Sequence, residues 1–237
     1  MLSNLFRNIP EVTKNLLIIN ILMFVGVIVF PQFEQMLALH YFESELFQPH
    51  QILTHIFMHG SIAHIAFNMF ALVMFGSQLE KVWGGKKFLI VYFASAVGAF
   101  LLQMLFNWYQ LIDASPDVLY LMKTEGLEAL QQGKNYMDPT LAKYNATFNG
   151  GMVGASGAIM GLLAAFAYLF PNTELMLIFL PIPVKAKYFI PFYMLVELFL
   201  GVNQFEWDNI AHFAHIGGAI VGFIIVLIWN KRRDSFY

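Results

Sequence analysis

The stretch GASGAIMG, from Gly154 to Gly161, decides how this chain of 237 residues is interpreted. It opens a long apolar run, yet it places one hydroxyl, that of Ser156, among glycines. A polar side chain in an apolar environment costs free energy unless it has a partner or a task. The question is therefore what surrounds this run and what the serine does there.

Composition identifies the solvent around most of the chain as lipid. Hydrophobic residues make up 59% of the sequence, charged residues only 12%, and the mean hydropathy is +0.63, whereas a soluble domain carries about 25% charged residues. The chain has no Cys, which excludes disulfides, thiolate sites and Cys-based zinc sites. A net charge of −2 without any basic block gives no reason to expect a nucleic-acid partner.

Apolar runs near the length that crosses a bilayer as a helix, about 20 residues, recur six times. They predict an all-α polytopic membrane protein, a six-helix transmembrane bundle, with spans at about 15–35, 61–79, 88–107, 154–170, 188–204 and 210–229. The fourth run is short and Gly-rich, so it requires packing inside the bundle. A further apolar piece, LMLIFLPIPV from Leu175, is too short to span and is expected to be a connecting loop at the interface.

The distribution of basic residues predicts the orientation, because cytoplasmic loops carry an excess of Lys and Arg. With both termini in the cytoplasm, the only Lys or Arg residues on the outer side are Lys123, Lys134 and Lys143. The predicted organisation is a cytoplasmic segment, a six-helix membrane domain and a basic cytoplasmic tail, at 1–14, 15–230 and 231–237. The membrane domain carries an outer-loop insertion at about 108–150. Its stretch LYLMKTEGLEALQQG is compatible with a short amphipathic helix, but a structured loop without chemistry is favoured.

Four polar side chains fall at one depth, toward the outer face. His64 and Asn68 lie at i and i+4 near the start of the second span, Ser156 opens the fourth, and His215 lies about five residues into the sixth. All three spans run in the same direction, so a rise of 1.5 Å per residue places the four groups within roughly 10 Å of one another in depth. Polar groups inside a membrane usually face the bundle interior and mark a functional site.

Glycines supply the lateral argument. Gly157 and Gly161 form a small-residue face on the fourth span, and Gly218 and Gly222 form another on the sixth. Such faces let helix backbones approach closely. With Gly154 they form the predicted helix-packing set, which would bring the serine and a histidine within hydrogen-bond distance.

The chemistry that suits this arrangement is acyl transfer, in which a base takes the proton of a serine nucleophile. Ser156 and His215 are the predicted catalytic residues, and the backbone N–H of Ser156, the His64 ring and the Asn68 amide are the predicted oxyanion donors. No acidic residue lies at this depth on the second, fourth or sixth span. We therefore expect a Ser–His dyad without a third, acidic member, its base oriented by packing or by another polar group.

Two alternatives concern the histidines. His50, His55, His59 and His212 also lie near the outer face, so a metal site is the rival explanation, weakened because H-E-x-x-H is missing and no carboxylate joins the cluster. We interpret His55 and His59 as buried hydrogen-bonding residues of the loop before the second span. His212 could also be the base, but it lies a turn nearer the loop containing Glu206 and Asp208, whereas Gly217 and Gly218 follow His215.

Three motifs on three different spans, THIFMHGSIAHIAFNMFALVMFGSQLE, GASGAIMG and AHIGGAIVGF, together resemble the rhomboid family of intramembrane serine proteases, in its bacterial six-helix form. The resemblance runs from about Pro49 to Trp229. It implies Ser156 as the nucleophile, His215 as the base, and His64 and Asn68 as oxyanion helpers. It further implies that transmembrane proteins are cleaved near the outer membrane face, that the fifth span is the side of substrate entry, and that no cofactor or metal is needed.

The sequence departs from this family where many members have Trp-Arg in the first outer loop, since His50 and Gln51 stand there. A non-catalytic rhomboid-like protein that binds membrane clients is the alternative function, disfavoured because both members of the dyad are present. A transporter is disfavoured because no buried carboxylate or paired charge traces a pathway through the spans. The compact six-span form predicts a bacterial inner membrane, with the active site open to the outer side.

Overall fold

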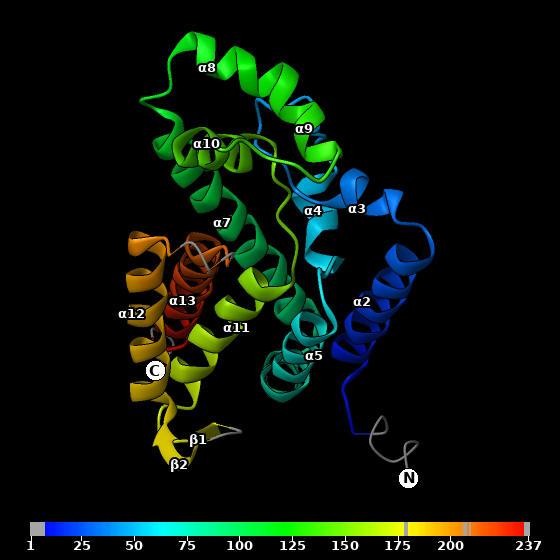
Figure 1. The fold of residues 1–237 in the computed structure, drawn as a ribbon. Helices are drawn as coiled ribbons and strands as arrows, with labels where there is room; N and C mark the ends of the chain where they lie inside the picture. The colour runs from blue at the N-terminus through cyan, green and yellow to red at the C-terminus, as the bar shows by residue number, and fades with distance from the viewer. Residues whose placement is uncertain (1–7, 178–179, 206–207, 209, 235–237) are drawn as a thin grey trace.

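The computed structural model describes residues 8–177, 180–205, 208 and 210–234 (Figure 1). Glu206 and the ends of the predicted N-terminal segment and tail lie outside the described residues. The first helical elements along the chain are α2 (Glu11–Val29), α3 (Gln32–Leu37), α4 (Gln51–Thr54) and the 3-10 turn η1 (His55–Phe57). The next are α5 (Ile62–Ala71), the π-helical η2 (Leu72–Gly76), α6 (Ser77–Trp83) and α7 (Gly85–Leu111).

The second half of the chain begins with the helices of the insertion, which are α8 (Pro116–Leu121), the π-helical η3 (Met122–Gly126), α9 (Leu127–Gln131) and α10 (Pro139–Asn149). The remaining elements are α11 (Ser156–Leu169), β1 (Glu174–Leu177), β2 (Leu180–Lys185), α12 (Ala186–Asn203) and α13 (His212–Asp234).

The predicted helical bundle is confirmed, and each of the six predicted spans overlaps a helix or a run of helices. The first prediction, 15–35, extends too far, because α2 ends at Val29 and α3 begins only at Gln32. Among the described residues, four segments are long and apolar enough to cross a membrane, namely Glu11–Val29, Ile62–Trp83, Gly85–Leu111 and His212–Asn230. The fourth predicted span, α11, has only 14 residues, and the fifth, α12, has 18 with Pro191 inside it.

α11 can be this short because protein surrounds it on most sides. Every residue from Gly157 to Phe166 is buried, and the helix packs against both α7 and α13. Figure 1 shows it in the middle of the bundle, with α12 and α13 on one side and α5 on the other. A helix that contacts neighbouring helices rather than lipid needs no full membrane-length apolar surface of its own.

The two glycine faces lie against each other. A Cβ atom on Gly218 would clash with the carbonyl oxygen of Gly157, and one on Gly222 with the carbonyl oxygen of Gly161. Gly161 also lies directly against the Ser95 side chain of α7. Only residues without a side chain permit backbones to approach this closely, so glycine at these positions sets the distance between α11 and α13.

Apolar side chains cover much of the outside of the bundle. Leu22, Val25 and Ile28 are exposed on α2, and Phe192 and Phe199 are exposed on α12. Rows of exposed large apolar side chains on long helices are what a lipid-facing surface requires. This surface agrees with the solvent inferred from composition.

The insertion is mainly helical, which corrects the favoured interpretation of its first half as a structured loop. Ser115 and Asp138 accept hydrogen bonds from the first turns of α8 and α10, so each helix begins at a capping side chain. Buried Asn149 donates to the carbonyl of Met122 at 2.7 Å and accepts from the Ser44 hydroxyl at 3.1 Å. The insertion is thereby fixed to the loop that follows α3.

The apolar piece predicted to be a connecting loop forms a two-stranded antiparallel hairpin, β1–β2, in which Leu175 pairs with Val184 and Glu174 with Lys185. It connects α11 to α12 at the end of the bundle opposite α8 (Figure 1). Two strands satisfy each other's backbone groups, which explains how a segment too short to span can remain apolar.

Candidate active site

Ser156 is presented by a sharp turn immediately before α11. Gly154 has φ of +131° and donates its N–H to the carbonyl of His55 at 2.9 Å. A Cβ atom at this glycine would lie 2.8 Å from Nε2 of His64. Both the backbone angle and the lack of space therefore require glycine here, and the turn leaves the serine as the first residue of α11.

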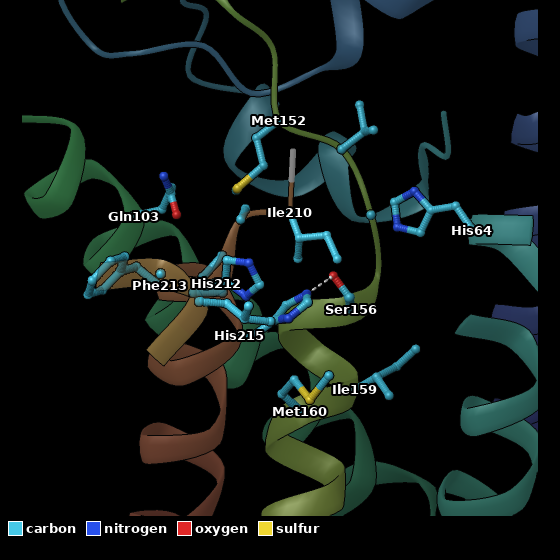
Figure 2. A pocket seen from close by; sticks show the side chains of 18 of the residues that line it. His64, Gln103, Met152, Ser156, Ile159, Met160, Ile210, His212, Phe213 and His215 are labelled. Atoms are coloured by element: carbon cyan, nitrogen blue, oxygen red, sulfur yellow. Dashed lines mark hydrogen bonds between the residues drawn. The ribbon is translucent and has the colours of Figure 1, made fainter. Parts of the chain in front are cut away.

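His215 meets Ser156 across the packed glycine faces. Its Nε2 atom lies 2.8 Å from the serine Oγ, and Figure 2 draws this hydrogen bond as a dashed line between α13 and α11. The structure brings this predicted pair together from positions 59 residues apart. Imidazole next to a hydroxyl at this distance can accept the proton of the serine.

A third side chain completes a line of hydrogen bonds behind the histidine. Nδ1 of His215 lies 2.9 Å from Oε2 of Glu197, which is 3% exposed on α12. The expectation of a dyad without an acidic member is therefore wrong in its geometry. That expectation rested on the second, fourth and sixth spans only. The carboxylate comes from the fifth span, α12, a helix of 18 residues that brings Glu197 next to His215.

His212 occupies the position behind the same carboxylate. Its Nδ1 atom lies 2.6 Å from Oε2 of Glu197 and its Nε2 atom 2.8 Å from Oδ2 of Asp208. Both ring nitrogens are thus engaged, and neither contacts Ser156. Of the two histidines considered as the base, only His215 reaches the serine.

Glu197, His212 and His215 also form a group that could hold a metal ion by proximity, since one ligand atom of each lies within 4.8 Å of the others. The earlier objection that no carboxylate joins the histidines is therefore wrong. Glu197 Oε2 lies 2.6 Å from Nδ1 of His212 and 2.9 Å from Nδ1 of His215. These are hydrogen-bond distances, so a proton lies between each pair of atoms. A metal bound at Nδ1 of neutral His215 would place the proton on Nε2, which could then not accept the serine proton.

His64 and Asn68 face the serine from α5. The backbone N–H of His64 is capped by the Ser61 hydroxyl at 3.1 Å, and Figure 2 shows its ring directed toward the segment that leads to Ser156. Asn68 lies one turn further along, and its buried amide nitrogen has no hydrogen-bond partner among the described residues. Two donors are thus available on the side of the serine opposite His215.

The remaining histidines of this region are buried in front of α5. His55 forms a hydrogen bond of 2.7 Å with the carbonyl of Gln51, as expected. His59 is also buried, its ring interacts with the backbone of Phe57, and it lies edge-on against His64. Burial lowers the pKa of each, His55 and His59, to about 4. Both rings are therefore neutral at pH 7.

The His50–Gln51 pair organises the loop between α3 and α4. Gln51 is fully buried, donates to the carbonyl oxygens of Met36 and Leu46, and accepts from the backbone of Gln48. The His50 ring contacts the same carbonyl of Met36 at 2.9 Å. These contacts give the pair a structural role in this loop.

A cavity of about 1760 Å³ contains the predicted site residues Ser156, His215, His64 and Asn68. On one side it extends to α5 and η2, which contribute Phe67 and Phe70 of α5 and Met74 of η2. On the other side it extends to α12, which contributes Phe189, Tyr193 and Leu200. Toward the insertion its wall includes Ala142, Ala146 and Thr147 of α10. The insertion is therefore part of the wall around the site.

A family model described as the rhomboid domain matches residues 46–232, most of the chain. The chain belongs to the rhomboid family. Among its relatives, rhomboid protein 1, mitochondrial, of Saccharomyces cerevisiae is 28% identical over 72% of this rhomboid and 39% of the relative. The rhomboid protease AarA of Providencia stuartii is 26% identical over 74% of this rhomboid and 56% of its own length.

An uncharacterised mitochondrial rhomboid protein of Schizosaccharomyces pombe is 31% identical over 76% of this rhomboid and 52% of the relative. This rhomboid thus spans about half the length, or less, of such relatives. The two fungal relatives, a plant relative and a fish relative all have mitochondrial names, which contradicts the expected bacterial inner membrane. The integral membrane character stands, as the apolar helices show.

Proposed function

We propose that this rhomboid is an intramembrane serine endopeptidase, in which Ser156 is the nucleophile and His215 the general base. The observation that carries the proposal is the 2.8 Å hydrogen bond between Ser156 Oγ and His215 Nε2 inside a cavity of a membrane bundle. A rhomboid protease among the relatives supports the same class of activity.

In the first step Ser156 Oγ attacks the carbonyl carbon of the scissile peptide bond while His215 Nε2 takes the hydroxyl proton. The carbonyl oxygen becomes an oxyanion, for which the N–H of Ser156 at the start of α11 and the side chains of His64 and Asn68 are the donors. The carbon–nitrogen bond then breaks and His215 returns the proton to the leaving amine. Water hydrolyses the acyl-enzyme by the same transfers in reverse.

The substrates are transmembrane proteins, which enter the cavity from the membrane between α5 and α12. The exposed aromatic rings of Phe67 and Phe70 at this opening suit an apolar helix. A peptide bond must leave its helix to be attacked, because the carbonyls of a helix are hydrogen-bonded within it. The polar groups of the site, His64 and Asn68 among them, offer hydrogen bonds to the unwound segment.

The test compares membrane-protein fragments released by wild type and by Ser156→Ala, using quantitative proteomics of cells that express each variant. Fragments cut within or next to transmembrane segments should appear only with wild type. A non-catalytic client-binding protein is the second candidate, and it predicts equal fragment patterns with both. A substrate found in this way is then tested with the purified proteins. If wild type and Ser156→Ala cleave it at similar rates, the serine mechanism is ruled out.

A further inference from the structure

We propose that Asp208, His212 and Glu197 form a chain of positioning residues, called the relay below, that holds His215 in the tautomer required by Ser156. The inference rests on the proposed function, because it concerns the orientation of the proposed base. No residue of the relay contacts Ser156. Each acts on the nucleophile only through His215.

The first link fixes the proton of the base. Glu197 Oε2 lies 2.9 Å from Nδ1 of His215, while Nε2 faces Ser156 at 2.8 Å. An ionised carboxylate only accepts hydrogen bonds, so it keeps the proton of neutral His215 on Nδ1. The lone pair of Nε2 then points to the serine hydroxyl. Without this acceptor the proton could reside on Nε2, where it would prevent proton transfer from Ser156.

The second link stabilises the carboxylate. Glu197 is 3% exposed and belongs to a helix of largely apolar composition. An isolated buried carboxylate carries a high desolvation cost unless hydrogen bonds and opposite charge offset it. The same Oε2 atom that accepts from His215 also accepts from Nδ1 of His212, at 2.6 Å. Two donors on one oxygen hold the carboxylate in place between the two histidines.

The third link supplies the opposite charge. His212 lies between two carboxylates, with Nδ1 at Glu197 and Nε2 2.8 Å from Asp208, and the side chains of His212 and Asp208 are 5% and 4% exposed. When both carboxylates are ionised, both ring nitrogens must donate, so the His212 ring carries a positive charge. This cation offsets the charge of Glu197 and makes its ionised form tolerable in the bundle.

The relay joins three consecutive segments of the chain. Glu197 belongs to α12, Asp208 to the connection between α12 and α13, and His212 to the first turn of α13. The base is therefore aligned only while α12 lies against α13. Because α12 is also one side of the cavity opening, a substrate that pushed α12 outward would disconnect His215 until the helix returned.

The test measures the rate at which a fluorophosphonate labels purified protein in detergent, as a function of pH. Glu197→Gln keeps the size of the side chain and removes its charge. We expect a labelling rate roughly 100- to 10,000-fold lower, the range seen when the tautomer of a catalytic histidine is no longer fixed. Glu197→Asp, which keeps a carboxylate behind His215, should retain more of the labelling rate than Glu197→Gln although its side chain is shorter.

His212→Gln and Asp208→Asn should give smaller losses in that order, since each lies one link further from the base. Within the part of the chain that the structure describes, Tyr193 on α12 and His64 across the cavity are the other titratable groups that act on this cluster, and both stay unchanged in the test. The matched control is Glu80→Gln. Glu80 is likewise a buried glutamate, 7% exposed, but it accepts from the Val12 and Thr13 backbone at the start of α2. This control should lower the melting temperature and leave the labelling profile of the remaining folded protein unchanged.

Three outcomes would overturn the relay. One is that Glu197→Gln is labelled with the wild-type rate and pH profile. If Ser156→Ala and His215→Ala are unlabelled in the same experiment, the proposed function is still supported. Another is an equal loss of rate in Glu197→Gln and Glu197→Asp that follows their melting temperatures, which a purely structural role would give. The last is a labelling rate of the wild-type protein that falls when EDTA is added and returns with zinc. That result would show that Glu197, His212 and His215 bind a metal ion. A wild type that is never labelled would refute the proposed function itself.

Discussion

Gly218 of α13 packs directly against the backbone carbonyl of Gly157 of α11. One turn further along, Gly222 makes the same contact with Gly161. Ser156 directly precedes the first of these contacts on α11, and His215 precedes it by three residues on α13. The hydrogen bond between serine and histidine is therefore a consequence of how closely the two backbones approach.

Gly218→Ala should damage both stability and reactivity, because its methyl group would overlap the Gly157 carbonyl and push the helices apart. Overpacking of this kind costs about 1–3 kcal/mol. We expect a lower melting temperature in detergent together with slower fluorophosphonate labelling. The control is Gly26→Ala on α2, where no described atom lies within 4 Å of the added carbon. Equal melting and labelling of Gly218→Ala and wild type would contradict the close approach.

His64→Ala and Asn68→Ala should each slow cleavage by roughly 10- to 1,000-fold, since each removes a donor to the oxyanion. Labelling of Ser156 should persist in both, because the hydrogen bond to His215 is untouched. Steady-state cleavage of a transmembrane substrate in proteoliposomes measures the first effect, and labelling yield the second. Wild-type turnover in both variants would show that neither side chain serves the oxyanion.

The two histidines of AHFAHIGG should respond differently to replacement by alanine. His215→Ala removes the ring that is hydrogen-bonded to Ser156 and should eliminate both cleavage and labelling. His212→Ala removes a link behind Glu197 and should keep labelling at a reduced rate. Equal melting temperatures are the required control. An inactive His212→Ala beside an active His215→Ala would reverse the assignment of the base.

Stability should fall as the pH drops from about 6.5 to about 4. His55 and His59 have their pKa lowered to about 4 in the folded protein, whereas an unfolded histidine titrates near 6.5. Between these values only the unfolded state binds the protons, so each ring costs up to about 1.4 kcal/mol per pH unit. Melting temperatures measured across this range should decline, and His59→Leu should reduce the decline. A His59→Leu curve parallel to that of wild type would show that His59 does not titrate in this way.

Sequence alone predicts the bundle and the residues at its centre because both depend on short-range patterns. Apolar runs define the helices, and the glycine spacing of α11 and α13 predicts which faces pack. The depth argument adds His64 and Asn68, since all three spans run in one direction. These signals come from periodicity and chain direction, which the sequence displays directly.

Sequence alone does not predict a contact that depends on a helix without such a pattern. Glu197 lies on α12, whose sequence carries no glycine pair that would indicate its neighbour, so its meeting with His215 and His212 requires the three-dimensional structure. A useful signal was still present, because a single Glu in an otherwise apolar span is costly unless it has a partner. The hairpin is not predicted from sequence, and a helix in the insertion is only the less favoured alternative, because the burial of both depends on the loops they contact.

The central claim is that Ser156 is a nucleophile activated by His215, and one measurement tests it most directly. Purified protein is treated with a fluorophosphonate, digested, and the modified residue located by mass spectrometry. The account predicts one adduct, on Ser156, in wild type, and none in a folded His215→Ala variant. A folded His215→Ala protein labelled on Ser156 at the wild-type rate, or a wild-type adduct at another serine with Ser156 unmodified, would contradict it.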